Sequence, residues 1–398
     1  MKQALRNLDE KTTRYVLPVG LIALLTGMFW IGDRSDYHRI FYIFVAPPTF
    51  AALLVKPTRI VQASNNAIFL AFLAFSGYTL ISISWSGTDE SFSSLLKRPF
   101  YIALLFYCVA LIALTTPKRI QTTLHVSIAC AACAALISMA IFYGSGGRGR
   151  LDGYGALYNP LLSSHVYGSF AALALGFLSS TQHRRHLLLL LISVALLLAM
   201  LLATGSRTPL VGMGAAVAWI AMTRANRRAL WILAATFVTA ILLIIFMPEN
   251  VTSRGLSYRP EIWKEAWSQI TLKPWLGYGF DHPMSFPIEG IRDAFADPHN
   301  MELAVLFSGG LLGLLLWLTL YAVTLRFAWH NRHIPLVIAA STALVYGFAA
   351  GLTEGNSFMS RPKEHWFLIW IPFAFLAGAA VMKKRHANLE TRSNQSTH

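Results

Sequence analysis

Apolar runs of about 18 residues or more recur along the whole chain, and no other feature of the sequence limits its fold so strongly. A run of that length is typical of a transmembrane helix. Hydrophobic residues make up 55% of the chain and charged residues only 13%, a balance outside the range of globular proteins. We therefore predict an all-α polytopic membrane protein.

The apolar runs predict about twelve transmembrane helices. They cover residues 15–31, 39–55, 66–85, 99–116, 120–143, 163–180, 187–204, 208–223, 229–247, 300–325, 335–353 and 364–382. An even number of spans places both termini on one side of the membrane. The short connections on that side are rich in Lys and Arg, so the positive-inside rule makes it the cytoplasmic side.

This topology divides the chain into four parts. Residues 1–247 form nine spans, residues 248–299 a large periplasmic loop, residues 300–382 three further spans, and residues 383–398 a cytoplasmic tail, which is polar after Arg385 and which we expect to be disordered from there on. Within the large loop, residues 260–270 place two tryptophans and three small or aliphatic residues on one helical face. This pattern predicts a short helix that lies in the membrane interface.

The formal net charge of +15 follows from this topology and not from a nucleic-acid interface. In our assignment, 19 of the 33 Lys and Arg residues but only 3 of the 18 Asp and Glu residues lie on the cytoplasmic side. No basic block in a soluble domain remains to bind nucleic acid. The positive-inside rule acts against the basic residues on the outer side, so we expect a function such as anion binding to keep them there.

Four arginines are the candidates for binding an anion on the outer side. Arg207 lies in a tight reversal between two spans, and Arg259 directly precedes the predicted interfacial helix. Arginine carries a permanent charge and a planar fork of donors that suits phosphate oxygens. Arg148 and Arg150, in a glycine-rich loop, are second choices. For all four, the alternative role is snorkelling to the phosphates of membrane lipids.

His299 stands where the large loop passes into the span that follows it. With Asp297 as N-cap and Pro298 as the first helical residue, His299 falls in the first turn, where the helix dipole disfavours the imidazolium. Glu302 follows three residues later on the same side of the helix and could hold the imidazole in one tautomer. Both residues also have a purely structural alternative. His299 could be a helix-start residue whose side chain hydrogen-bonds to the backbone, and Glu302 could be a polar residue at the outer end of the helix.

Motifs of several other enzyme classes are absent from the sequence. It contains no H-E-x-x-H, no Walker motif and no Asp-x-Asp, which argues against zinc proteolysis, nucleotide hydrolysis and metal-dependent transfer from a nucleotide sugar. The three cysteines lie inside apolar runs and predict neither a disulfide nor a metal site. We expect no cofactor and no metal.

The motifs around the candidate residues resemble those of the O-antigen ligase and O-antigen polymerase superfamily. Members have about a dozen spans, one large periplasmic loop and a histidine that opens the span after it. The stretches that carry the resemblance are residues 299–303 with 307–313, residues 204–209 around Arg207, residues 258–263 around Arg259 with 274–279, and the Asn-Pro loop at 153–160.

The resemblance implies transfer of a glycan from undecaprenyl pyrophosphate on the periplasmic face of the bacterial inner membrane. The acceptor is a sugar of the lipid A-core in ligases, a second lipid-linked repeat unit in polymerases, and a protein hydroxyl in related oligosaccharyltransferases. We favour an O-antigen ligase, because the chain has one compact outer loop and no second loop to serve as an acceptor platform. A polytopic transporter is a further alternative, but the spans carry almost no charge at mid-membrane.

The resemblance also implies roles for individual residues. Arg207 and Arg259 would bind the pyrophosphate, and His299 would take the proton of the acceptor hydroxyl as it attacks the anomeric carbon. A single displacement of this kind inverts the anomeric centre and relies on arginine, not on a metal, to stabilise the leaving group. Arg148 and Arg150 match the family pattern less closely. We expect them, together with Glu302, which the helical spacing selected, to contact the substrates.

Overall fold

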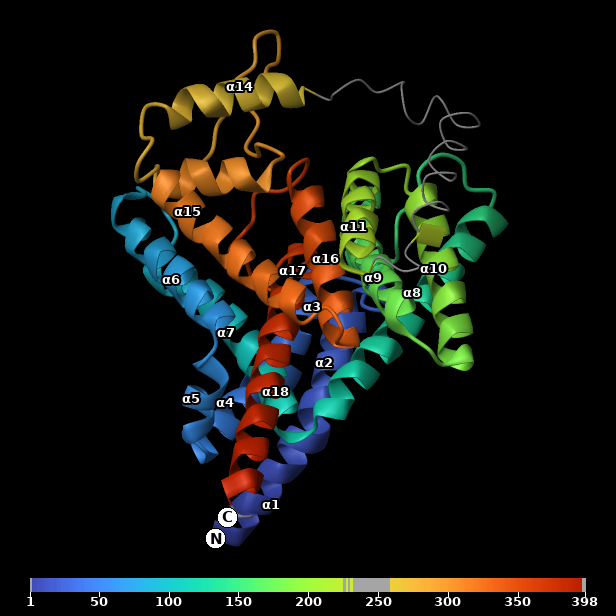
Figure 1. Cartoon of the computed structure of the whole chain (residues 1–398). Coiled ribbons are helices and arrows are strands. Elements are labelled where there is room, and N and C mark those ends of the chain that lie inside the picture. The colour runs from blue at the N-terminus through green and yellow to red at the C-terminus, as the bar shows by residue number, and fades with distance from the viewer. Residues whose placement is uncertain (1, 225–226, 228–229, 232–257, 396–398) are drawn as a thin grey trace.

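The computed structural model describes residues 2–224, 227, 230–231 and 258–395, and every regular element in these ranges is a helix (Figure 1). In chain order these are α1 (Lys2–Lys11), η1 (Thr12–Val16), α2 (Leu17–Thr26), η2 (Gly27–Phe29), α3 (Arg34–Ile40), η3 (Phe41–Val45), α4 (Ala46–Val55), α5 (Thr58–Ser64), α6 (Ala67–Ser82), η4 (Ile83–Trp85), α7 (Phe92–Thr115), α8 (Pro117–Gly144), η5 (Gly155–Leu157), α9 (Pro160–Ser180), α10 (Arg184–Ala203), α11 (Thr208–Arg224), α14 (Arg259–Ile270), α15 (Met301–His330), α16 (Pro335–Gly351), α17 (His365–Leu368) and α18 (Trp370–Gln395).

Eight helical stretches among the described residues are long and apolar enough to cross a membrane. They are Asn7–Phe29, Arg34–Val55, Ala67–Trp85, Phe92–Thr115, Pro117–Gly144, Pro160–Ser180, Arg184–Ala203 and Met301–His330. Helices α11, α16 and α18 coincide with three more predicted spans. The predicted span at 229–247 falls almost entirely outside the described residues. The all-α membrane fold is therefore confirmed, whereas the count of twelve spans stays a prediction.

Helices from the two ends of the chain meet at one end of the molecule (Figure 1). Asp9 of α1 forms a buried ion pair with Arg59 of α5 at 2.5 Å. Arg385 of α18 donates a hydrogen bond to the carbonyl of Leu114 at the end of α7. The termini thus share a side, as the predicted topology requires. The tail that we expected to be disordered is helical as far as Gln395, because α18 continues to that residue.

Helix α15, at the predicted tenth span, is broken at Gly310, where φ is 60° and ψ is −165°. The loop that follows α14 supplies partners for backbone groups at the break. The N–H of Tyr278 donates to the carbonyl of Phe307 at 2.9 Å, and the N–H of Leu311 donates to the carbonyl of Pro274 at 2.8 Å. Lipid offers no such partners, so a break at membrane depth is tolerated only where protein supplies them. The break therefore fastens the large loop to α15.

Helix α14 confirms the predicted amphipathic helix, but its apolar face packs on protein. Ile262, Ala266 and Ile270 are buried against Phe286 of the large loop and against the first turns of α15, over which α14 lies in Figure 1. Trp267, which we expected on the buried face, is 56% exposed. Contact with α15 thus replaces the contact with the membrane surface that we predicted for the aliphatic part of this face.

Replacing Gly310 by Ala should destabilise the protein. A Cβ at this position would clash with the backbone of Trp275, and a φ of 60° is unfavourable for any residue with a side chain. We expect a loss of roughly 1–3 kcal/mol or more in the free energy of unfolding, measured as a lower midpoint of thermal unfolding of the purified protein in detergent.

The Gly214→Ala variant is the matched control for this experiment. Gly214 lies in α11, and a Cβ built on it meets nothing within 4 Å. Its unfolding midpoint should stay the same or rise slightly, because Ala favours a helix over Gly. Equal midpoints for the two variants would contradict our account of the break.

Candidate functional site

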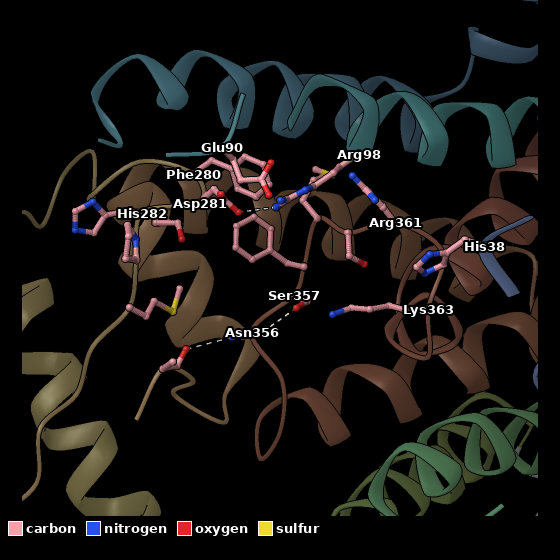
Figure 2. Close-up of a pocket in the computed structure, with 17 residues that line it drawn as sticks. His38, Glu90, Arg98, Phe280, Asp281, His282, Asn356, Ser357, Arg361 and Lys363 are labelled. Atoms are coloured by element: carbon pink, nitrogen blue, oxygen red, sulfur yellow. Dashed lines mark hydrogen bonds and ion pairs between the residues drawn. The ribbon is translucent and has the colours of Figure 1, made fainter. Parts of the chain in front are cut away.

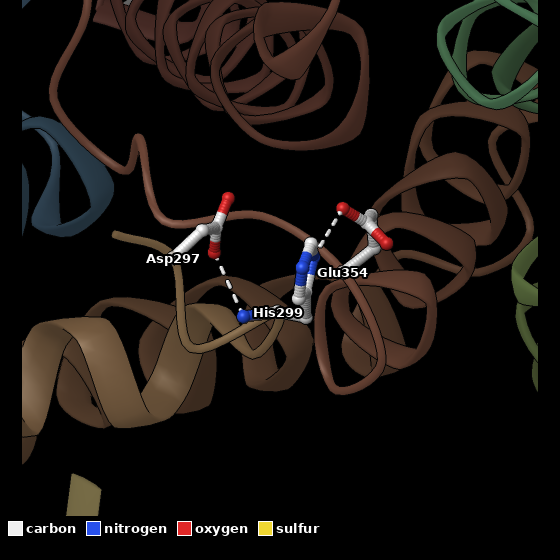
Figure 3. A group of neighbouring side chains, drawn as sticks. All are labelled: Asp297, His299 and Glu354. Atoms are coloured by element: carbon white, nitrogen blue, oxygen red, sulfur yellow. Dashed lines mark hydrogen bonds and ion pairs between the residues drawn. The ribbon is translucent and has the colours of Figure 1, made fainter. Parts of the chain in front are cut away.

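A buried carboxylate, that of Glu354, lies between the histidine and one of the arginines that the sequence analysis selected. Its Oε1 atom is 3.0 Å from Nδ1 of His299 (Figure 3). Its Oε2 atom accepts a hydrogen bond from Nη2 of Arg259 at 3.0 Å. Nε of Arg259 also donates to the carbonyl of Thr353 at 3.0 Å. The turn that follows α16 thus joins the start of α14 to the loop before α15.

His299 lies just before α15 and not inside its first turn. The N-cap is Asn300, whose side chain accepts the N–H of Leu303 at 2.9 Å. The φ of His299 is 48°, in the left-handed region that a residue with a Cβ seldom adopts, and its N–H donates to Asp297 at 2.7 Å (Figure 3). Our predicted N-cap, Asp297, is therefore wrong, because its carboxylate closes a turn that precedes the helix.

The carboxylate beside His299 reverses the effect that we expected from the helix start. The hydrogen bond with Glu354 raises the pKa of His299 above its ordinary value of 6.5, although burial acts in the opposite direction. Burial alone would raise the pKa of Glu354, but the hydrogen bond from His299 and the nearby positive charges bring it below its ordinary value. Glu354 is therefore an anion at neutral pH that favours the imidazolium.

The same contact selects one tautomer of the neutral imidazole. With an ionised carboxylate as its partner, Nδ1 of His299 carries the proton, and Nε2 keeps its lone pair. Nε2 has no hydrogen-bond partner in the part of the chain that the structure describes, and the side chain is 30% exposed. His299 is thus arranged to accept a proton at Nε2.

The segment that carries Arg207 lies beside the turn that contains Thr353 and Glu354. Arg207 directly precedes α11, and Oγ1 of Thr208, the first residue of that helix, lies 3.4 Å from Oγ1 of Thr353. Thr353 also accepts a hydrogen bond from Arg259 and adjoins Glu354. The structure therefore brings together the segments that carry all three predicted principal residues.

The two arginines of the glycine-rich loop differ in their placement. Nε of Arg150 donates to the carbonyl of Thr204 at 2.8 Å, and its Nη2 donates to Oγ of Ser206 at 2.7 Å, so Arg150 supports the reversal that carries Arg207. Arg148 is exposed and makes no hydrogen bond or ion pair with a described residue. The structure links Arg150 to the site and leaves Arg148 apart from it.

Glu302 does not contact His299. Its carboxylate is buried beside Trp317 and Tyr321 in the interior. The spacing of three residues that we used applies only within a helix, and His299 stands outside α15. The glutamate that we expected beside the imidazole was therefore the wrong one, since Glu354 holds that position.

Sequence reasoning missed Glu354 altogether. It follows the predicted span at 335–353 by a single residue. An acidic residue at the outer end of a span, where nothing else required a charge, was the one indication that could have directed attention to it.

Asp297, His299 and Glu354 also form a group that could hold a metal ion, since their potential ligand atoms lie within 4.8 Å of one another (Figure 3). Burial raises the pKa of Asp297, whose carboxylate already accepts the N–H of His299. A metal ion bound at Nδ1 would have to replace the hydrogen bond between His299 and Glu354. The observed contacts therefore favour a histidine–carboxylate pair.

Two comparisons with known proteins identify the family of this chain. Residues 192–318 match a family model described as O-antigen ligase, a segment that includes Arg207, Arg259 and His299. The chain is also 52% identical over 366 residues to a protein of Pseudomonas aeruginosa named O-antigen ligase, an alignment that covers 92% of this chain and 90% of that protein.

Replacing Glu354 by Gln should lower the pKa of His299, because the amide cannot stabilise the imidazolium as the carboxylate does. NMR titration of protein with isotopically labelled histidine, in detergent, measures this pKa. The His299→Gln variant identifies the resonance by its loss.

Glu302→Gln is the control for this titration, since that carboxylate lies away from the imidazole. It should leave the pKa of His299 unchanged. An unshifted pKa in Glu354→Gln, or equal shifts in both variants, would show that Glu354 does not control the protonation of His299.

Proposed function

The chain belongs to the O-antigen ligase family, and we propose that it transfers O-antigen polysaccharide from undecaprenyl pyrophosphate to the lipid A-core on the periplasmic face of the bacterial inner membrane. The observation that carries this proposal is the single carboxylate, Glu354, that joins His299 to Arg259 beside the segment of Arg207. A base and a phosphate-binding group, the two parts that such a transfer needs, thus lie side by side.

His299 is the general base in the proposed reaction. Its Nε2 takes the proton of an acceptor hydroxyl while the hydroxyl oxygen attacks the anomeric carbon of the donor. The imidazolium that forms is stabilised by the Glu354 carboxylate at Nδ1. The raised pKa makes His299 a stronger base, and it also means that activity is lost as the pH falls through that pKa.

Arg207 and Arg259 bind the pyrophosphate of the donor in the proposed reaction. The bond between the anomeric carbon and the pyrophosphate oxygen breaks as the new glycosidic bond forms, so negative charge develops on the leaving group. Two hydrogen bonds to Glu354 and Thr353 orient the Arg259 guanidinium and leave its Nη1 for a ligand. Pyrophosphate is already a good leaving group, so we propose that the arginines alone stabilise its developing charge. Because the transfer is a single displacement, it inverts the anomeric centre.

Arg150 is a positioning residue in this scheme, since it supports the reversal that carries Arg207. The sidedness that we propose follows from the charge pattern. The basic connections and both termini would be cytoplasmic, and the large loop and the site would be periplasmic.

Replacing His299 by Ala should abolish transfer. The purified enzyme would be reconstituted with lipid-linked glycan and lipid A-core, without added metal, and the joined product scored. Loss of a general base costs about 10²–10⁴-fold in rate. The variant must keep the unfolding midpoint of the parent, and an undiminished rate would exclude His299 as the base.

The same proposal has a test in cells. A strain that lacks this protein should carry a core without polymer while lipid-linked chains persist. A core that bears one repeat unit would instead indicate a polymerase, and loss of the lipid-linked chains from the periplasmic face would indicate a transporter.

Replacing Arg207 or Arg259 by Lys should reduce kcat/KM by about tenfold or more, because Lys keeps the charge but loses the planar fork that binds two phosphate oxygens. Arg292→Lys is the matched control, since Arg292 is an exposed residue of the large loop with no role in the site. If the variants at 207 and 259 keep the activity of the control, these arginines do not bind the pyrophosphate.

A further inference from the structure

A second group of basic side chains lines an open cavity of about 560 Å³ beside the site (Figure 2). The cavity lies between the start of α7, the large loop and the segment that joins α16 to α17. Its basic residues are His38, Arg98, His282, Arg361 and Lys363, and its acidic residues are Glu90 and Asp281. Neither Arg207 nor Arg259 lines it, so it is separate from the arginines that we assign to the donor.

This cavity adjoins the histidine–carboxylate pair directly. Two of its lining residues, Ala296 and Asn356, join the segments of that pair, because Nδ2 of Asn356 donates to the carbonyl of Ala296 at 3.5 Å. Ala296 precedes Asp297 in the turn that positions His299, and Asn356 follows Glu354 by two residues. Neither His299 nor Glu354 lines the cavity, but the cavity ends at residues next to both of them, away from the arginines that we assign to the donor.

Arg98 already has an anionic partner in the cavity, whereas Lys363 has none. Nη1 of Arg98 lies 2.6 Å from Oδ1 of Asp281. No acidic oxygen of the described residues lies within 4.0 Å of Nζ of Lys363, which points into the cavity in Figure 2. The acidic residue nearest to Lys363 in sequence, Glu364, contacts other groups. Its Oε1 atom lies 3.1 Å from Nη2 of Arg34 and 3.1 Å from Nδ1 of His365.

The surroundings of Lys363 disfavour its charge. Burial lowers its pKa, and the charges of Arg34 and Arg98 lower it further, against the opposing effects of Glu364 and Asp297. A cation that is partly removed from water and lies near other cations gains most from a bound anion. Glu90 also lines the cavity but forms no ion pair with Lys363, so an anion bound in the cavity would stabilise the charge of Lys363.

The segment that carries Lys363 is held in place by buried hydrogen bonds. Nε1 of Trp366 donates to the carbonyl of Ser360 at 3.1 Å, and Nε1 of Trp370 donates to the carbonyl of Phe358 at 2.8 Å. These indoles are fully buried. Lys363 is thus presented from a rigid support, which reduces the entropy that a ligand would have to remove on binding.

We propose that this cavity binds the acceptor saccharide and that Lys363, with Arg361, binds a phosphate group on it. The inference rests on the proposed function, because it assigns the acceptor to one side of His299 and the donor to the other. The polar lining, which includes Asn356 and Ser357, suits the hydroxyl groups of a sugar. Entry from this side directs an acceptor hydroxyl to Nε2 of His299 while the pyrophosphate lies at the arginines, as displacement with inversion requires.

The test compares two acceptors, one that carries its phosphate groups and one from which they have been removed. With the phosphorylated acceptor, Lys363→Gln should raise the acceptor KM by about tenfold or more, the usual effect of losing a hydrogen bond to a charged group. The donor KM should not change. The parent enzyme should show at least as large a rise with the dephosphorylated acceptor, because removing the phosphate also removes its contact with Arg361. Lys363→Gln should add nothing to that rise, because its partner is already gone.

Three further variants sharpen the test. Lys363→Arg should restore most of the affinity for the phosphorylated acceptor, because the positive charge is kept. Arg361→Gln, at an exposed position, should raise the same KM without a change in the unfolding midpoint. Lys264→Gln is the control, since Lys264 is exposed on the polar face of α14, away from the cavity.

Several outcomes would overturn the proposal. One is a rise in the donor KM alone, and another is an equal effect of Lys363→Gln on both acceptors. An effect that follows the content of anionic phospholipid in the vesicles, and not the phosphate of the acceptor, would assign the site to lipid head groups. If the parent enzyme forms no product, the proposed function fails. Direct binding of the two acceptors to parent and Lys363→Gln protein would then still decide whether the cavity recognises phosphate.

Discussion

The buried carboxylate of Glu354 is the interaction on which the arrangement of the site depends. Removing a carboxylate from water costs several kcal/mol, and the cost is offset only if partners satisfy both oxygens. His299 supplies one partner and Arg259 the other. Each of them is held by the same anion, so the position of the proposed base and the position of the proposed donor-binding arginine are coupled. In a protein whose large outer loop comes from one part of the chain and whose last spans come from another, this carboxylate sets their relative position.

The membrane fold explains why the surrounding segments are rigid enough to hold this geometry. Helix α15 cannot leave backbone groups unpaired at its break, so the loop at 274–279 is bound to it by main-chain hydrogen bonds. Helix α14 packs its aliphatic face on the same part of α15, and Nε1 of Trp263 donates to the carbonyl of Pro298 next to His299. The large loop is thereby a packed extension of the bundle, and it carries functional residues at fixed places.

The cationic side chains near the candidate site form two separate groups. Arg207 and Arg259 belong to segments that meet at Thr353 and Glu354, and Lys363 and Arg361 face a separate cavity beyond Asn356. Through Glu354, His299 is joined to the first group, and Asn356 and Ala296 connect its segment to the second. If the two groups bind the two substrates as we propose, they would hold the donor and the acceptor apart until their reacting atoms meet.

Local sequence was enough to select three residues whose segments the structure brings together, but it did not show which side chains contact them. Arg207, Arg259 and His299 were selected because each is a basic residue at an outer boundary, where the charge pattern gave it no topological reason to be. Glu302 was chosen as the partner of His299 by helical spacing, and the choice was wrong because the left-handed turn at His299 puts that residue outside the helix. Nothing in the sequence was a reason to select Lys363, because a lysine near the start of a span is common. Only the structure shows that no acidic group of the described residues pairs with it.

The sequence by itself determined the all-helical membrane fold, and it supplied the predictions that the termini share one side of the membrane and that Arg207, Arg259 and His299 form the site. These are properties of apolar runs of about 18 residues and of the charges between them, and each can be read within a short window. Only the tertiary structure decided that Glu354 orients His299 and that Lys363 faces an open cavity. Glu354 is 55 residues from His299 and 95 from Arg259, and contacts over such separations arise from the packing of α14, α15 and α16, which no local pattern encodes.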